Sequence, residues 1–390
     1  MLERMHPAHR LGFSRDCLSA WRASTLGVTP QTTKTREKYW NHWRQYAAQC
    51  HIDPWLTNTS PLERDITINA FAARVRSGFY GRGAQVKVQS VNDALSAISK
   101  TIELAGQPSP LYREANKYQL STERLCEGFR REDPPAVPQL AVPVSIVNHC
   151  YKSSLLTNDA LTAAAGQLTI IAFYYLLRVG EYTQPRTVTL NGEKLRATRT
   201  VQFSVDDVGF WKDNKQLPKA SPLDVLLTAD SATLQISNQK NGRMGESIHQ
   251  WAIDSELCPV KALARRIHHI LKYGGSSDSL ICDYFDDNGD VYTVTSQHII
   301  KLVRTACKQL MLHKQGIDPD LIGAHSLRAG GAMALALAGF ESTVIMKMGR
   351  WTSLTFQMYI HNQIAHLSKN ISQEMSKDLP FMNIAAIERA

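Results

Sequence analysis

Apolar residues recur at helical spacing in four stretches of the first third of the chain. In the third stretch, for example, Val91, Leu95 and Ile98 follow one another at intervals of four and three residues and share one helix face. Pro61 suits the start of a helix, because the first helical turn needs no backbone N–H from it. We therefore expect an all-helical N-terminal domain. Its predicted helices cover residues 33–50, 61–79, 88–104 and 121–131.

A proline-bearing segment separates these helices from the rest of the chain. Residues 130–138 hold three prolines beside charged residues, and proline forbids a helix and stiffens an extended backbone. A chain of 390 residues is also long for one domain. The predicted division is an arm with partial disorder at 1–30, a helical domain at 31–133, a linker at 134–143, a second domain at 144–370 and a tail at 371–390.

The second domain mixes helical and strand patterns. Residues 159–177 are apolar on all sides, which indicates a central buried helix. Asn241-Gly242 lies between two stretches of strand pattern, which is typical of a β-hairpin turn. The fold class we expect is mainly α with a small β-sheet (α+β). The other predicted elements are helices at 144–152, 259–271, 296–313 and 325–338 and strands at 200–205, 232–237 and 247–253.

Composition indicates a soluble globular protein with an anionic partner. Hydrophobic residues make up 43% and charged residues 20% of the chain, which is enough for a sizeable core. The formal net charge is +9, and a basic balance favours partners such as nucleic acid. The N-terminal part is the more basic: residues 1–140 hold 19 Lys and Arg against 13 Asp and Glu, and the remainder holds 25 against 22.

Several functional classes are disfavoured. The seven cysteines are scattered without a CxxC pair, which indicates free thiols in a reducing compartment rather than disulfides or a zinc site. No apolar run is long enough for a membrane span, and the N-terminus has no apolar signal core. The adjacent acidic pairs Asp206-Asp207 and Asp286-Asp287 favour solvated turns over a metal-dependent nuclease. We expect neither a metal nor a cofactor.

Candidate chemistry lies mostly in the last third of the chain. His325 and Arg328 stand three residues apart at the start of a predicted helix, so both can face one side of it. Arg178 follows the apolar helix, Trp351 follows Gly349-Arg350, and Tyr359 comes eight residues later. Each residue alone has an ordinary explanation, such as a helix cap or a core aromatic. Their joint order and spacing are the informative feature.

In this order and spacing, the five residues resemble the catalytic domain of the tyrosine recombinases, the phage integrases and Cre-like enzymes. The resemblance covers residues 140–370, whereas the N-terminal domain matches only in size, helicity and position. It implies that Arg178 and Arg328 bind the scissile phosphate, that His325 and Trp351 assist them, and that Tyr359 is the nucleophile. Trp351 stands where histidine is commoner in the family.

The resemblance also implies roles for two residues outside this set. Lys240, at the hairpin turn, is the expected general acid for the leaving 5′ oxygen, although a solvated turn lysine is the alternative. Glu181 is expected to support the basic residues. DNA contacts are expected from basic residues of the helical domain: Lys34, Arg36, Lys38, Arg44, Arg82 and Lys87.

The implied function is site-specific recombination of a mobile element through a 3′-phosphotyrosine and a Holliday junction. The implied partners are double-stranded DNA with inverted repeats and, in the synapse, three further copies of the chain. The C-terminal tail would dock on a neighbouring protomer or pack on its own domain. The protein would be found with DNA, in a bacterial nucleoid or a eukaryotic nucleus according to the host.

Two other functions remain open from the sequence. A type IB topoisomerase or a telomere resolvase would use similar phosphotyrosine chemistry with a different outcome. A DNA-binding relative without catalysis would keep the fold alone. Recombination between two separate duplexes, if found, would decide against the first, and the intact residue set argues against the second.

Overall fold

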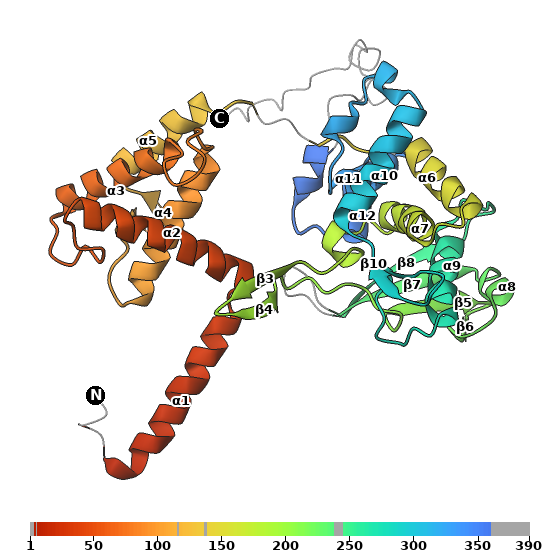
Figure 1. Cartoon of the computed structure of the whole chain (residues 1–390), viewed down its shortest axis with the longest axis horizontal. Coiled ribbons are helices and arrows are strands. Elements are labelled where there is room, and N and C mark those ends of the chain that lie inside the picture. Colours follow the sequence, from red (N-terminus) through yellow and green to blue (C-terminus); the bar gives the residue numbers. More distant parts are fainter. Residues whose placement is uncertain (1–3, 5, 115–116, 136–138, 238–244, 360–390) are drawn as a thin grey trace, which may run out of the picture. The chain divides into compact units, whose positions relative to one another are not determined.

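The computed structural model describes residues 4, 6–114, 117–135, 139–237 and 245–359 (Figure 1). Helices dominate, with small antiparallel sheets, so the predicted α+β class is confirmed. The chain divides into two compact units. Residues 1–136 and 186–199 make up the first unit, and residues 137–185 and 200–390 make up the second. The predicted division did not foresee that residues 186–199 cluster with the N-terminal part.

The first unit is helical. Trp43, Phe71 and Leu95 are fully buried in its core and come from three different helices. Ser60 and Glu63 form a capping box that fixes the start of one helix, because each side chain accepts a backbone N–H that the helix leaves unpaired. The helices are α1 (Pro7–Leu26), α2 (Pro30–Gln49), α3 (Pro61–Arg76), α4 (Val88–Leu104) and α5 (Leu120–Glu132), with a short hairpin of β1 (Tyr112–Glu114) and β2 (Lys117–Tyr118).

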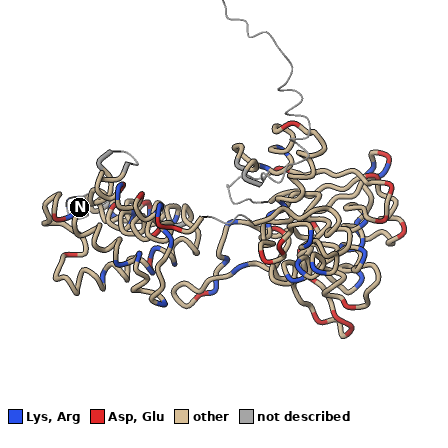
Figure 2. Tube along the Cα trace, turned by 90° about the horizontal axis from the view of Figure 1, so that it is seen from above, with Lys and Arg blue, Asp and Glu red and all other residues tan. Residues whose placement is uncertain are grey.

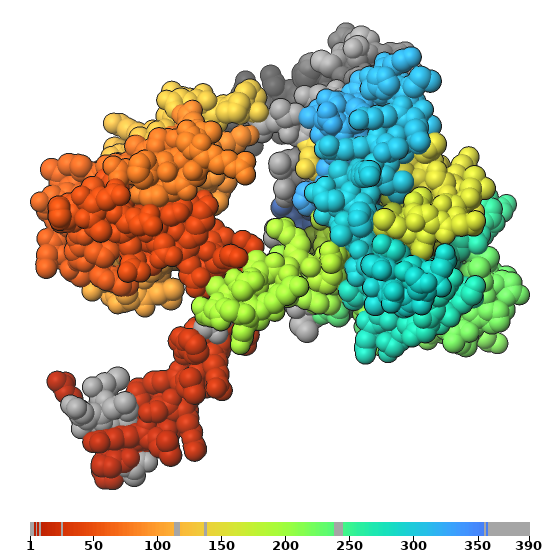
Figure 3. All heavy atoms as spheres, in the orientation of Figure 1, coloured from red at the N-terminus to blue at the C-terminus, as the bar shows by residue number. Residues whose placement is uncertain are grey.

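The N-terminal arm differs from the prediction. Residues 7–26 form helix α1 rather than a partly disordered segment. Nearly all of its described side chains are exposed. In Figure 3, no other element covers the face of α1 that is in view. Its apolar residues do not concentrate on one face, so the periodicity that identifies the other helices gives no signal here. The four helices that the sequence does predict correspond to α2, α3, α4 and α5.

The second unit is built around α7 (Ala160–Tyr174). Every residue from Ala164 to Phe173 is buried, as predicted for a central helix. Gly166 allows α6 to approach closely, since a Cβ there would lie 2.5 Å from the Cys150 carbonyl oxygen. The helices in contact with α7 are α6 (Val144–Leu156), α9 (Pro259–Lys272), α10 (Ser296–Gln309) and α11 (Ser326–Leu337), and α12 (Ser342–Gly349) packs on α11.

A four-stranded antiparallel sheet, in the order β6-β5-β7-β8, belongs to the same unit. The predicted hairpin is confirmed as β7 and β8, with Leu234 paired to Ile248. The predicted strand at 200–205 is wrong. Its buried Phe203 and Val205 bond through their N–H groups to the carbonyls of Glu181 and Ser279, outside any ladder. The strands are β5 (Val208–Lys212), β6 (Lys215–Leu217), β7 (Ser231–Ile236) and β8 (Glu246–Trp251).

The remaining elements are short. The hairpin of β3 and β4, which the sequence analysis missed, belongs to the first unit, where the Gln31 N–H donates to the Ala197 carbonyl at 3.2 Å. The predicted helix at 296–313 ends earlier, at Gln309, and a separate 3₁₀ turn follows. These elements are β3 (Thr187–Leu190), β4 (Glu193–Arg196), α8 (Leu223–Leu226), β9 (Asp283–Phe285), β10 (Val291–Thr293), η2 (Val179–Glu181), η3 (Leu312–Gln315), η4 (Pro319–Leu321) and η5 (Leu354–Tyr359).

Candidate active site

The end of α7 determines where Arg178 lies. The helix stops at Tyr174, before the predicted end at 177, and Leu176 takes a left-handed backbone with φ 47°. Such a backbone cannot continue a right-handed helix. Arg178 consequently precedes the 3₁₀ turn η2 instead of closing α7, which is a correction to the predicted position. The Glu181 carboxylate accepts the Arg178 backbone N–H at 2.7 Å and its Nη1 at 3.1 Å.

Glu181 is shared by two arginines. Its side chain is 2% exposed, so its charge needs compensation inside the protein. Besides Arg178, Arg350 donates Nη1 to Oε1 at 3.2 Å and Nη2 to Oε2 at 3.0 Å, a bidentate pair. Glu181 therefore contacts one of the predicted phosphate-binding arginines and a further, unpredicted one.

Arg350 is the site residue that the sequence analysis missed. It is 8% exposed, follows α12 with a left-handed backbone (φ 55°), and also donates Nη2 to the Leu176 carbonyl at 3.1 Å. Burial lowers the pKa of its guanidinium, while the neighbouring Glu181 charge opposes that shift. No spacing rule marks this residue. The only sequence signal is its place between Gly349 and Trp351.

Arg328 comes from α11 and is 3% exposed. Its Nη1 donates to the Leu176 carbonyl at 2.7 Å, and its Nη2 donates to the Gly349 carbonyl. The guanidinium carbon lies 4.3 Å from the centre of the Trp351 ring, within the range of a cation–π contact. The structure thus brings Arg328 and Trp351 together, as their predicted shared site requires.

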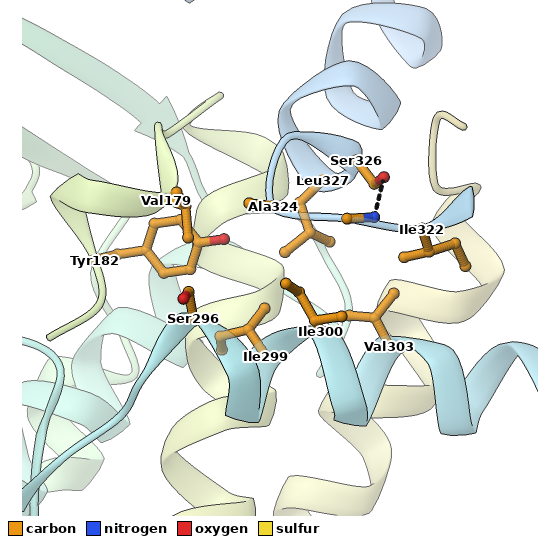
Figure 4. Close-up of a pocket in the computed structure, with 11 residues that line it drawn as sticks. Val179, Tyr182, Ser296, Ile299, Ile300, Val303, Ile322, Ala324, Ser326 and Leu327 are labelled. Carbon is orange, nitrogen blue, oxygen red and sulfur yellow. Dashed lines mark hydrogen bonds between the residues drawn. The ribbon is translucent and has the colours of Figure 1, made fainter. Parts of the chain in front are cut away.

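His325 stands at the exposed start of α11. Its backbone N–H donates to Gln139 Oε1 at 3.1 Å. The neighbouring Ser326 hydroxyl accepts the Gly323 N–H at 2.9 Å, which fixes the turn into the helix (Figure 4). His325 therefore lies on the same helix as Arg328, one turn before it.

Apolar packing beneath this turn holds α11 against α10 and η2. Figure 4 shows Leu327 pointing toward Ile299 and Ile300 of α10 and Tyr182 lying beside Val179. The space between these side chains is about 10 Å³, which is at most the room of a single water molecule. This region is a packing contact and gives no room for a ligand.

The chain after Trp351 approaches the same helices. Phe356 of η5 is fully buried with Leu176, Ala332 and Ile345, and its ring lies 5.7 Å from that of Trp351. Tyr359 is the last residue of η5, and its side chain lies outside the described part of the structure. Lys240 also lies outside the described residues.

A larger cavity of about 430 Å³ opens beside Arg350 and Trp351. Its lining combines charged and polar side chains from the start of β8 with residues of α12 and of the turn after it. A volume of this size accommodates a phosphodiester group. The lining residues are Glu246, Ser247, Thr343, Met346, Lys347, Arg350 and Trp351.

The predicted DNA-binding residues differ in exposure. On α2, Lys34, Lys38 and Arg44 are exposed, whereas Arg36 is half-buried. Arg82 and Lys87 are exposed, and Lys87 directly precedes α4. Figure 2 shows Lys and Arg interspersed with Asp and Glu along the traces of both units.

Other site types have little support among the described residues. Within those ranges, no group of three or more His, Cys, Asp or Glu side chains is arranged to hold a metal ion. No described helix has both the length and the apolar content to cross a membrane. All seven cysteines are free thiols. Burial raises the pKa of the Cys150 thiol to about 12, which makes it a poor nucleophile.

Comparison with known proteins gives structural likenesses alone. No family model matches the sequence, and no curated protein matches it. The XerH site-specific recombinase bound to palindromic difH substrate is 14% identical, with a TM-score of 0.46 over 80% of this chain and 72% of that one. The Tn1549 transposon integrase in complex with transposon right end DNA is 12% identical, with a TM-score of 0.41 over 80% and 85%. The XerA recombinase is 13% identical, with a TM-score of 0.35 over 89% and 99%. The solved structures that this chain resembles are thus site-specific recombinases and a transposon integrase.

Proposed function

We propose that this protein is a tyrosine site-specific recombinase, an enzyme that cuts and rejoins DNA through a covalent protein–DNA intermediate. The observation that carries the proposal is that Arg178, Arg328 and Trp351, which are up to 173 residues apart in the sequence, meet at one turn. Arg178 donates to the Arg350 carbonyl, and Arg328 donates to the Gly349 carbonyl and lies against the Trp351 ring. Their order along the chain, with His325 between Arg178 and Arg328 and with Tyr359 after Trp351, is the order that suggested this chemistry.

The charge of the cluster suits phosphoryl transfer. Two arginines, Arg178 and Arg350, pair with the buried Glu181 carboxylate, which leaves these three groups with a net charge of about +1. Arg328 adds a further positive charge beside Trp351. The transition state of such a transfer carries extra negative charge on the non-bridging oxygens of phosphorus. Arginine stabilises that charge well, because its planar fork offers two donors and stays protonated.

The proposed reaction has two balanced steps. The Tyr359 phenol loses its proton to a nearby base or to water, its oxygen attacks the scissile phosphorus, the bond to the 5′ oxygen breaks, and protonated Lys240 gives a proton to that leaving oxygen. The products are a 3′-phosphotyrosine and a free 5′-hydroxyl. A 5′-hydroxyl from a partner duplex then attacks the phosphotyrosine and gives its proton to Lys240, and the released Tyr359 oxygen takes up a proton, so the bond energy is conserved.

His325 and Trp351 are proposed to assist through their ring N–H groups. Both can donate to non-bridging phosphate oxygens. His325 lies at the exposed N-terminus of α11, where backbone N–H groups and the helix dipole favour an anion. Glu181 would orient Arg178, which it already holds through two hydrogen bonds.

DNA binding is proposed to use both units as a clamp. The exposed Lys34, Lys38 and Arg44 of α2, with Arg82 and Lys87, would contact phosphates of the duplex. Arg36 is less suited to this role, because it is half-buried. We further propose inverted-repeat sites, a synapse of four protomers, and a Holliday junction between the two strand exchanges. In this assembly the tail at 371–390 would dock on a neighbouring protomer.

The test needs no knowledge of the natural site. A pool of nicked duplexes with randomised flanks is incubated with the protein without added metal, and SDS-resistant protein–DNA adducts are captured and sequenced. We expect one enriched sequence family, and no adduct with Tyr359→Phe. Joining of two separate duplexes that carry the enriched site would then favour a recombinase over a topoisomerase. Binding without any adduct would overturn the proposal in favour of a DNA-binding relative.

A further inference from the structure

One tight turn, Gly349 to Trp351, touches both proposed phosphate-binding arginines. The Gly349 carbonyl accepts from Arg328 Nη2, and the Trp351 ring covers the Arg328 guanidinium at 4.3 Å. The Arg350 carbonyl accepts from Arg178 Nη2 at 3.4 Å. The orientation of Arg178 and Arg328 consequently depends on the conformation of this one turn.

The Arg350 side chain holds the turn in place. The left-handed backbone of Arg350 is one that residues with a Cβ rarely adopt, so surrounding contacts must maintain it. Those contacts are the bidentate pair with Glu181 and the bond to the Leu176 carbonyl at 3.1 Å. Leu176 is itself left-handed, and its carbonyl also accepts from Arg328. Two unusual backbone positions are thus joined through Arg350.

Arg350 also sets the local charge balance. Without it, Glu181 would face Arg178 alone, and the two would form a neutral pair. With Arg350 present, the three groups carry a net charge of about +1, and the carboxylate is divided between two guanidinium groups. Arg178 then retains electrostatic attraction for an incoming anion.

We infer that Arg350 is a positioning residue of the proposed reaction. It acts through Glu181 and the 349–351 turn to hold Arg178 and Arg328 in the geometry that binds a tetrahedral anion. Both of its terminal nitrogens are engaged inside the protein, so this role requires no contact with the phosphate. The expected effect of Arg350 on catalysis rests on the proposed function, whereas its expected effect on anion binding does not.

The first test compares the rate of adduct formation with DNA affinity. Arg350→Ala, Arg350→Lys, Glu181→Gln and the double variant Glu181→Gln/Arg350→Ala are assayed in single turnover on the enriched duplex. We expect Arg350→Ala to lower the rate at saturating DNA about 100-fold, because small displacements of positioned groups cost that much. The Kd for DNA should change less than threefold. Arg350→Lys should recover part of the rate.

The double variant separates positioning from direct phosphate contact. If Arg350 acts through Glu181, the double variant should be about as slow as Arg350→Ala alone. If the rate loss of the double variant equals the product of the two single-variant losses, Arg350 acts independently of Glu181, and the inference is overturned. A wild-type rate in Arg350→Ala would overturn it as well. Arg265→Ala, which removes a half-buried arginine paired with Glu256, is the matched control and should keep the wild-type rate.

A second readout does not depend on catalysis. Tungstate, a tetrahedral dianion, should raise the melting temperature of the wild-type protein and of Arg265→Ala, but not that of Arg350→Ala. If the wild type forms no adduct with any DNA, the proposed function fails, whereas loss of tungstate stabilisation in Arg350→Ala would still support the positioning role. Equal stabilisation of the two would contradict it. If Arg350→Ala does not fold, the effect of tungstate on the melting temperature is measured for Arg350→Lys and Glu181→Gln instead and compared with that of the wild type.

Discussion

At the scale of single residues, the site combines three side chains that could be predicted from the sequence with one that could not. Arg178, Arg328 and Trp351 could be predicted, because their spacing along the chain carries the resemblance. Arg350 could not, since its role comes from a left-handed backbone and a buried carboxylate that only the folded chain brings together. The positions of the Lys240 and Tyr359 side chains stay predictions.

Gly349 is the first residue that can be tested. A Cβ at this position would lie 1.6 Å from an atom of the Trp351 ring, so Gly349→Ala must displace that ring from Arg328. We expect adduct formation to fall at least tenfold and the protein to be destabilised by about 1–3 kcal/mol, as for other overpacked sites. Urea unfolding and the single-turnover assay measure the two effects. Gly128→Ala, whose Cβ would meet no atom within 4 Å, lies inside helix α5; it should leave adduct formation unchanged and stabilise the protein by about 0.5–1 kcal/mol.

The two arginines proposed to bind phosphate, Arg178 and Arg328, should differ in their effect on stability. Arg178→Ala and Arg328→Ala should both lose most adduct formation while still folding. Arg328→Ala should also lower the unfolding free energy by about 2–4 kcal/mol, because the Leu176 and Gly349 carbonyls lose a buried donor. Arg178→Ala should lower the unfolding free energy less than Arg328→Ala does, because the Arg178 side chain is more exposed. Equal stabilities, or cleavage near the wild-type rate by either variant, would contradict this account.

At the scale of elements, periodicity predicts long helices well and short irregular segments poorly. The predicted helix at 88–104 has the bounds of α4, because its apolar positions recur at intervals of three and four residues over its whole length. The strand predicted at 200–205 fails because its apolar residues pack into the core while their N–H groups bond outside any sheet. The hairpin of β3 and β4 was missed although Asn191-Gly192 carries the same turn signal that identified the β7–β8 hairpin.

The start of α7 allows a test of helix capping and its pH dependence. Asp159 accepts the Thr162 hydroxyl and backbone N–H, and these hydrogen bonds hold the pKa of its carboxyl below the ordinary value. Because the pKa of the Asp159 carboxyl is lower in the folded protein than its value near 4 in the unfolded chain, the ionised carboxylate stabilises the folded protein above about pH 4. This stabilisation is lost as the pH falls through the folded-state pKa.

Asp159→Ala should therefore cost about 1 kcal/mol at pH 7, as is usual for a lost N-cap. The cost should shrink in acid, below the folded-state pKa of Asp159. Asp159→Asn, which keeps a capping oxygen without the charge, should cost less at pH 7. Urea unfolding of the three proteins at pH 7 and near pH 3 measures this. A cost that is independent of pH would rule out the carboxylate as its source.

At the scale of the whole molecule, the sequence predicts two parts and a basic N-terminal side, and the structure divides into two units. The place of residues 186–199 in the first unit could not be predicted, because it depends on contacts of this segment with α2 and with the residues before it. Each unit has its own buried core. How the units close on DNA is part of the proposal.

Salt dependence tests the proposed clamp. Lys34→Ala and Lys38→Ala should each weaken DNA binding to a similar degree for all sequences and reduce the slope of log K against log salt by about one. Lys100→Ala, which removes a partly exposed lysine already paired with Glu103 at 2.8 Å, is the control and should leave the slope unchanged. Gel-shift titrations between 50 and 200 mM salt, the range in which such slopes are usually resolved, provide the measurement. An unchanged slope in Lys34→Ala and Lys38→Ala would exclude both lysines from the DNA contact.

The most direct test of the account is the identity of the residue that joins the protein to DNA. An SDS-resistant adduct from the randomised pool is digested with protease and nuclease, and the peptide that retains a nucleotide is sequenced by mass spectrometry. The account predicts a single modified residue, Tyr359, linked to a 3′-phosphate, and no modified peptide from Tyr359→Phe. A nucleotide on another residue, or a 5′-phosphate linkage, would contradict it.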